Sequence, residues 1–143
     1  MSLDVQINYK ESKIANYFLD HPYSYGYLSE KDKSSYMEEG CWTANITHNL
    51  GEMASNVPVS FNDKETTLYY ACWRPEEIGV KTVSDLLPLL IQGIHYMVDH
   101  RKELLQYNSP NELGTYNGFM KFLLNYKQAC EDNDQDCTIE TDR

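Results

Sequence analysis

The sequence predicts an α+β fold in which three main helices pack with a small antiparallel sheet formed by the terminal strands. Three observations predict it: strict alternation at the N-terminus, weaker alternation at the C-terminus, and apolar stripes at helical spacing between them. The chain has 143 residues, of which 41% are hydrophobic, so it can bury one substantial core. No repeat or flexible linker divides it, and we therefore expect a single domain over residues 1–143.

The terminal strands are predicted from period-two patterns. Residues 3–10, LDVQINYK, place Leu3, Val5, Ile7 and Tyr9 on one face and polar side chains on the other. Near the C-terminus, Cys137, Ile139 and Thr141 share a face in a weaker pattern. We expect these two segments to pair, whereas residues 11–40 are irregular and contain tyrosine-rich turn material.

The first helix is predicted over residues 41–54, because apolar side chains recur there at helical spacing, namely Trp42, Ile46, Leu50 and Met53. After a polar break, residues 66–73, TTLYYACW, are rich in threonine and aromatic residues. Such a composition favours a short strand, which should end before Pro75.

Two further helices are predicted. The second covers residues 82–107, where Thr82 and Asp85 have the spacing of a capping box. Pro88 is expected to kink this helix near its first turn or to move its start later. The third covers residues 115–131, and its apolar stripe consists of Phe119, Phe122, Leu123, Tyr126 and Cys130.

Charge and cysteine usage narrow the class of protein. The net charge is −10, which argues against direct nucleic-acid binding, because that depends on basic side chains that neutralise phosphates. The first ten residues do not form a signal peptide, and no apolar run is long enough to cross a membrane, so we expect a cytoplasmic protein. The four cysteines lack both C-x-x-C spacing and a secretory context, and we expect them to be reduced thiols.

The stretch TANITHNLGEMA, residues 43–54, carries unusually many short polar side chains. On a helix, Asn45 and Asn49 would share one face, with His48 about a quarter-turn away. Amides on an apolar face cost about 1–3 kcal/mol each unless they are hydrogen-bonded. Their partners are either neighbouring backbone groups or a ligand with mixed donors and acceptors, and we predict that the segment lines a pocket.

The segment CWRPEE, residues 72–77, offers a second candidate contact. Trp73 could stack on a flat ligand, and the planar guanidinium of Arg74 could hold a phosphate or carboxylate. The alternative is a tryptophan in the core and an arginine paired with Glu76 or Glu77.

The segment ELGTYNGF, residues 112–119, offers a third candidate ligand contact. Gly114 permits a tight entry to the third helix, and Thr115 could cap it while leaving backbone N–H groups for an anion. Tyr116 lies next to them. The alternative is that the cap only satisfies the helix itself.

Catalytic and metal-binding patterns are incomplete. His48 and Glu52 have ligand spacing, but no other histidine or cysteine completes a metal site. The acidic turn after residue 131 begins like a calcium loop, yet Cys137 stands where glycine is required. Cys41 precedes a tryptophan as in papain-like enzymes, without the rest of that motif. We therefore predict no metal, no cofactor and a non-enzymatic protein.

Four segments together resemble a family of small proteins met in phages and in bacterial genomes that carry phage-like genes. They are NITHNLGEMA, CWRPEE, SDLLPLL and GTYNGFMKFLLNYKQAC, and the resemblance covers roughly residues 41–143. It departs from the family in a longer connector, VSFNDKETTLYYAC, and in Leu113, where a tryptophan is common. Most members have no assigned function. The resemblance therefore implies a phage context, in which small accessory proteins block host defence, some by sequestering nucleotide signals.

The leading hypothesis is a non-enzymatic phage accessory protein of the host cytoplasm that binds a nucleotide-like or similarly polar small molecule. Its ligand-binding residues would be Asn45, His48, Asn49, Trp73, Arg74, Gly114, Thr115 and Tyr116. One alternative is an acidic protein-binding inhibitor or nucleic-acid mimic, and another is a small hydrolase that uses His48 with Glu52 or Cys41. The twelve tyrosines suit an interface as well as a ligand site, which leaves a homo-oligomer open.

Overall fold

A computed structural model describes residues 2–8, 41–110, 114–133 and 135–143 of the chain. Tyr9, the tyrosine-rich segment within residues 11–40, Leu113 and the side chain of Cys41 lie outside the described part. The described residues form an α+β fold, as the sequence predicts. No helix among them is long and apolar enough to cross a membrane.

The larger sheet has three strands in the order β2-β1-β5, and both neighbouring pairs are antiparallel. Strand β1 (Ser2–Asn8) lies in the middle, between β2 (Cys41–Thr47) and β5 (Ile139–Asp142). The alternation predicted for the first strand is confirmed, because Leu3, Val5 and Ile7 are all buried. The predicted pairing of the two terminal strands is also confirmed, with Val5 opposite Thr141 and Ile7 opposite Ile139.

Strand β2 replaces the first half of the helix predicted over residues 41–54, and that prediction is wrong for residues 41–47. Trp42 and Ile46 are four residues apart, a spacing that satisfies both a helical stripe and a period of two. Thr43, Ile46 and Thr47 are β-branched and favour the strand. Only the end of the segment is helical, as the short helices η2 (His48–Leu50) and α3 (Gly51–Ser55).

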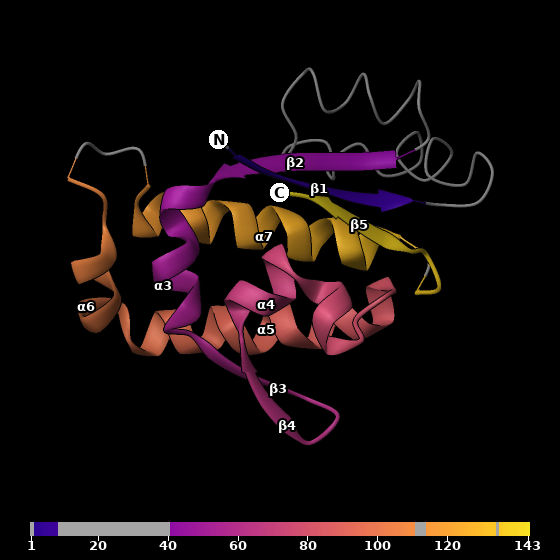
Figure 1. The fold of residues 1–143 in the computed structure, drawn as a ribbon, viewed down its shortest axis with the longest axis horizontal. Coiled ribbons are helices and arrows are strands. Elements are labelled where there is room, and N and C mark those ends of the chain that lie inside the picture. The colour runs from indigo at the N-terminus through magenta and orange to yellow at the C-terminus, as the bar shows by residue number, and fades with distance from the viewer. Residues whose placement is uncertain (1, 9–40, 111–113, 134) are drawn as a thin grey trace.

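Two long helices form the layers beneath the sheet. Helix α7 (Tyr116–Asp132) lies between the sheet and helix α5 (Val83–Asp99), as Figure 1 shows, and it contacts both β2 and α5. The ring of Trp42 on β2 stacks on that of Tyr126 on α7 with centroids 5.3 Å apart. The core therefore runs from the inner face of the sheet through α7 to α5.

The second predicted helix is interrupted. Helix α5 ends at Asp99, and α6 (Arg101–Leu104) and η4 (Leu105–Tyr107) follow after His100, whose ring Nδ1 and backbone N–H both lie 2.9–3.0 Å from the carbonyl oxygen of Tyr96. At the other end, the carboxylate of Asp85 accepts hydrogen bonds from the backbone N–H groups of Lys81 and Thr82. Pro88 lies inside α5 and does not move its start.

The predicted strand over residues 66–73 is mostly helix α4 (Leu68–Trp73), and this correction has a simple cause. Leu68, Ala71 and Cys72 are fully buried at helical spacing, and their burial outweighs the strand preference of the tyrosines between them. Only the first two residues belong to a strand. They end the hairpin of β3 (Pro58–Phe61) and β4 (Lys64–Thr67), which projects from the side opposite the sheet (Figure 1).

Candidate functional site

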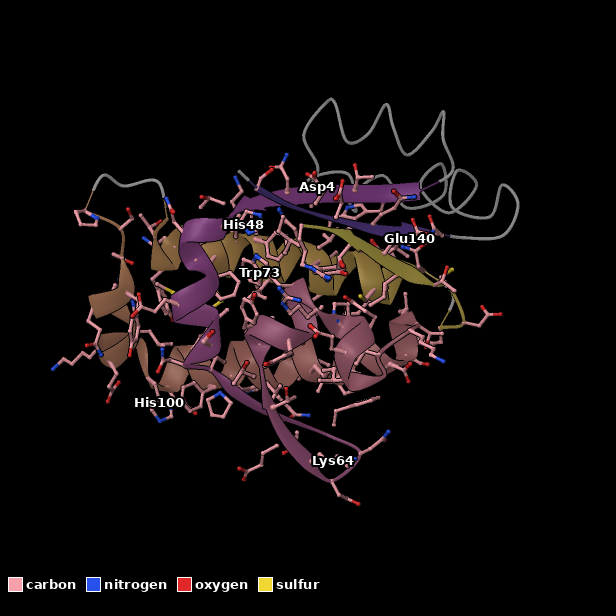
Figure 2. The ribbon with its side chains drawn as sticks, in the orientation of Figure 1. Asp4, His48, Lys64, Trp73, His100 and Glu140 are labelled. Carbon is pink, nitrogen blue, oxygen red and sulfur yellow. The ribbon has the colours of Figure 1, made fainter. Side chains whose placement is uncertain are left out.

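The predicted site residues His48 and Trp73 meet inside the molecule, between the sheet and α4 (Figure 2). The indole N–H of Trp73 donates a hydrogen bond to Nδ1 of His48 at 2.9 Å. This bond makes Nδ1 an acceptor, so the neutral ring carries its proton on Nε2. Nε2 is buried and has no hydrogen-bond partner among the described residues.

Trp73 occupies the position of a core residue, the alternative that the sequence left open. Its side chain is 1% exposed, and Tyr69 stacks on it with ring centroids 5.6 Å apart and planes inclined by 6°. Phe119 of α7 lies on another side at 6.2 Å. A ligand ring could reach Trp73 only by displacing one of these side chains.

Arg74 follows α4, and its guanidinium already has two partners. Nε donates to the hydroxyl of Tyr69 at 3.2 Å, and Nη1 pairs with the carboxylate of Glu77 at 3.1 Å. Through these two contacts the pKa of Arg74 lies above its usual value, the bond to Tyr69 having the larger effect. Arg143 binds the neighbouring Glu76 and the carbonyl oxygen of Trp73. Desolvation raises the pKa of Glu76, but the hydrogen bond from Arg143, together with a backbone hydrogen bond and the charges of Arg143 and Arg74, brings it below its usual value.

The start of α7 is largely satisfied by the protein itself. Thr115 Oγ1 accepts the N–H of Gly118 at 3.0 Å, and Asn108 Oδ1 accepts the N–H of Tyr116 at 2.7 Å. The Tyr116 hydroxyl donates to the carbonyl oxygen of Met97 at 2.6 Å and so fixes α7 to α5.

Gly114 lets the loop before α7 pack on the residues that follow β2. A Cβ atom on this glycine would lie 3.2 Å from Cβ of Asn49 and 3.3 Å from Cγ of Leu50. Asn49 itself is exposed, and its N–H donates to Thr47 Oγ1 at 3.3 Å. Asn45 lies on β2, so the two asparagines do not share a helical face, as the sequence had suggested.

Asn45 instead lines a pocket of about 590 Å³ between the sheet and the first half of α7, which we call the sheet–α7 pocket. Its apolar lining comes from Val5, Ala44, Ile46 and Phe122. The polar lining is contributed by β1 and β2 (Asp4, Gln6, Thr43, Asn45), by α7 (Gly118, Lys121, Asn125) and by β5 (Glu140, Thr141, Asp142). Figure 2 shows Asp4 and Glu140 on the sheet, apart from the His48–Trp73 pair.

Several polar groups of this pocket are free to contact a ligand. In the described part of the chain, the side chains of Asn45, Lys121 and Asn125 make no hydrogen bond or ion pair with the protein. Asn125 is half-buried, while Asn45 and Lys121 are exposed. Because side chains alternate along a strand, that of Asn45 projects from the outer face of the sheet, away from α7. The pocket therefore combines an apolar surface with the amide of Asn125 and the ammonium group of Lys121, which can turn towards a bound molecule.

Lys121 and Asn125 were not among the residues predicted from the sequence. They lie four residues apart on the polar flank of α7, a pattern that most surface helices share. What distinguishes them is that they line the same pocket as Ala44, and that position depends on residues 41–47 forming a strand.

The buried cysteines are poorly suited to nucleophilic chemistry. Burial raises the pKa of the Cys72 thiol to about 12, and burial, with a smaller contribution from Cys72, raises that of Cys130 as well. Both thiols therefore stay protonated near neutral pH. Within the described residues, no three histidine, cysteine or acidic side chains are placed to hold a metal ion.

Comparison of the chain with protein-family models, with curated protein sequences and with solved structures gives no match.

Proposed function

We propose that this chain is a non-enzymatic protein that binds a small polar molecule in the sheet–α7 pocket. The observation that carries the proposal is the pocket itself, whose volume of about 590 Å³ falls within the range of small-molecule sites, roughly 300–1,000 Å³. Such sites join an apolar surface to a few polar groups that fix the orientation of the ligand. The sheet–α7 pocket has both.

In this proposal the flat or apolar part of the ligand lies against Phe122 and Ala44. The amide of Asn125 binds its hydrogen-bonding edge from the α7 side, since an amide offers both a donor and an acceptor. Nucleobases, nucleosides and other polar molecules with mixed donors and acceptors are the natural first candidates. Sequestering such a molecule as a phage accessory protein, to counter host defence, is the role we propose for this binding.

The remaining predicted residues would act indirectly. His48 and Trp73 are bonded to each other, and Tyr116 is bonded to α5. They hold α4, α5 and α7 in place under the sheet, and the width of the pocket depends on the position of α7. We therefore expect substitutions at these positions to change stability more than ligand affinity.

Thermal-shift assays with nucleobases, nucleosides, nucleotides and amino acids, followed by calorimetric titration of every hit, test the proposal. Asn125→Ala should weaken binding about three- to tenfold, because it removes one or two hydrogen bonds worth about 0.5–1.5 kcal/mol, whereas Asn45→Ala, on the outer face of the sheet, should leave binding unchanged. Asn117→Ala is the matched control, since Asn117 is exposed on the same helix and does not line the pocket. If affinity falls equally in all three variants, or if no compound binds, the proposal is wrong.

A further inference from the structure

The sheet–α7 pocket is a trough formed by one row of small side chains across the inner face of the sheet. In the register of the sheet, Val5 lies directly opposite both Ala44 on β2 and Thr141 on β5. Directly opposed side chains share a face, and Val5 is buried, so all three point towards α7. Gly118 of α7 lines the same pocket, and a Cβ atom there would meet Thr115 Oγ1 at 3.2 Å and no atom of the sheet within 4 Å.

Larger side chains bound the trough along the strands. Rows of side chains on one face of a sheet lie about 7 Å apart, which is twice the rise per residue. The two bounding rows consist of Trp42, Ile7 and Ile139 on one side and of Ile46 and Leu3 on the other. The trough is therefore one row wide, and it suits a flat or slender apolar body that lies across the strands against Phe122.

The alternation that turns Thr141 inwards turns the acidic side chains outwards. Asp4, Glu140 and Asp142 occupy the alternate positions of β1 and β5 and project from the outer face of the sheet, away from α7. The remaining charged residue of the lining is Lys121 on α7. In the described part of the chain, its ammonium group has no ion-pair partner. Among these residues, the space between the sheet and α7 therefore contains one positive charge and no facing carboxylate.

Further hydrogen-bond donors lie close to this charge. Asn125 is half-buried and lies one helical turn after Lys121, so its amide can donate to the same anionic group. The hydroxyl of Thr141 offers another donor from the sheet. Within the described residues, neither side chain has a hydrogen-bond partner. Gly118 belongs to the first turn of α7, where the helix dipole adds partial positive charge.

We propose that the ligand of the sheet–α7 pocket is a monocarboxylate with a flat or slender apolar body. Its carboxylate is bound by Lys121 and Asn125, and its body lies in the trough formed by Ala44, Val5 and Thr141. A single negative charge is favoured because one ammonium group neutralises one charge, and the chain as a whole has a net charge of −10. This inference rests on the proposed function and adds the charge and shape of the ligand to it.

Four probes separate charge from shape in calorimetric titrations of the full chain. Indole-3-acetate has one carboxylate on a flat body, and indole-3-acetamide has the same shape without the charge. Adamantane-1-carboxylate keeps the charge on a globular body, and AMP supplies a phosphate. Indole-3-acetate should bind most tightly, about fivefold more tightly than its amide. Raising the salt concentration should reduce this difference, because salt screens exposed charges.

Variants of two lysines locate the effect. Lys121→Met should weaken indole-3-acetate about fivefold and leave indole-3-acetamide unchanged, as expected for an exposed ion pair worth up to about 1 kcal/mol. Lys121→Arg, which keeps the charge, should retain most of the affinity. Lys102→Met makes the same change of charge on the exposed surface of α6 and is the matched control, which should change neither probe.

The outcomes distinguish this inference from the proposed function. If indole-3-acetamide or AMP binds as tightly as indole-3-acetate, or if the two methionine variants weaken it equally, the assigned charge is wrong. If adamantane-1-carboxylate binds as tightly, the assigned shape is wrong. If indole-3-acetate does not bind but another compound does and is weakened by Asn125→Ala, this inference fails and the proposed function stands. If no probe and no compound of the wider panel binds, both proposals fail.

Discussion

Replacing Gly93 by alanine should destabilise the protein, although alanine is normally the better helix residue. Gly93 is buried in α5 and faces Leu68 of α4. A Cβ atom at this position would lie 2.5, 2.6 and 2.7 Å from Cδ1, Cγ and Cδ2 of Leu68. Leu68 is fully buried, so neighbouring core side chains restrict the rotamers that it can adopt. The contact therefore has to be relieved by moving α4 away from α5.

Two effects of opposite sign decide the size of the change. Alanine in a helix interior is favoured over glycine by about 1 kcal/mol. Overpacking a core typically costs about 1–3 kcal/mol, and the upper half of that range applies here because the overlap includes the branch atom Cγ. We expect Gly93→Ala to lower the free energy of unfolding by about 1–2 kcal/mol and Tm by roughly 3–6 °C for a chain of this size.

Urea denaturation followed by circular dichroism measures this change, and a second background tests its cause. Leu68→Ala alone should cost about 2–5 kcal/mol, because it leaves a cavity. In that background the overlap is gone, so adding Gly93→Ala should stabilise the protein. If Gly93→Ala stabilises the wild-type chain, or has the same effect in both backgrounds, the packing of α4 on α5 described above is wrong.

Three further predictions concern contacts within the core and at a helix end. Trp73→Phe and His48→Ala should each lower the free energy of unfolding, and a double-mutant cycle should give a coupling of about 1 kcal/mol; a coupling near zero would show that their hydrogen bond contributes nothing. The pKa of Cys72 is raised from 9.0 to about 12 by burial, so above pH 9 the unfolded chain loses this proton first and stability falls as pH rises towards 12. Cys72→Ala should make that decline shallower in denaturation curves measured across this pH range, whereas an unchanged slope would mean that the thiol is not buried. Thr115→Ala should cost about 1 kcal/mol through loss of the cap on α7, with Thr138→Ala, whose exposed side chain caps no helix, as its control; equal costs would contradict the capping role.

The sequence predicts those elements whose pattern has only one explanation. The alternation of Leu3, Val5 and Ile7 fits no helix, and the stripe of residues 116–132 fits no strand. Residues 41–47 fit a helix as well as a strand, because Trp42 and Ile46 satisfy both periods, and the partner of this segment, β1, is distant in the sequence. Pairing between distant segments is a tertiary effect that a local pattern does not contain.

The candidate site likewise contains residues that the sequence identifies and residues that it does not. Residue type alone points to Asn45, which lies at the pocket but whose side chain projects from the outer face of the sheet, and to Trp73, whose ring is covered by Tyr69. It could not point to Lys121 and Asn125, because nothing in the sequence of α7 distinguishes a pocket-lining polar residue from a solvated one. Their place beside Ala44 becomes visible only when β2 is placed next to α7.

The most direct test of the central claim, that the sheet–α7 pocket holds a small polar molecule, is native mass spectrometry of the purified protein after addition of the tightest hit from the panel. Ala44→Phe is the matched variant, since Ala44 lines the pocket and is half-buried on β2, where an aromatic side chain suits the strand. We predict one bound molecule per wild-type chain, released on denaturation, and none on a folded Ala44→Phe variant. Equal occupancy of the two proteins, or an unoccupied wild-type chain at saturating ligand, would contradict the account.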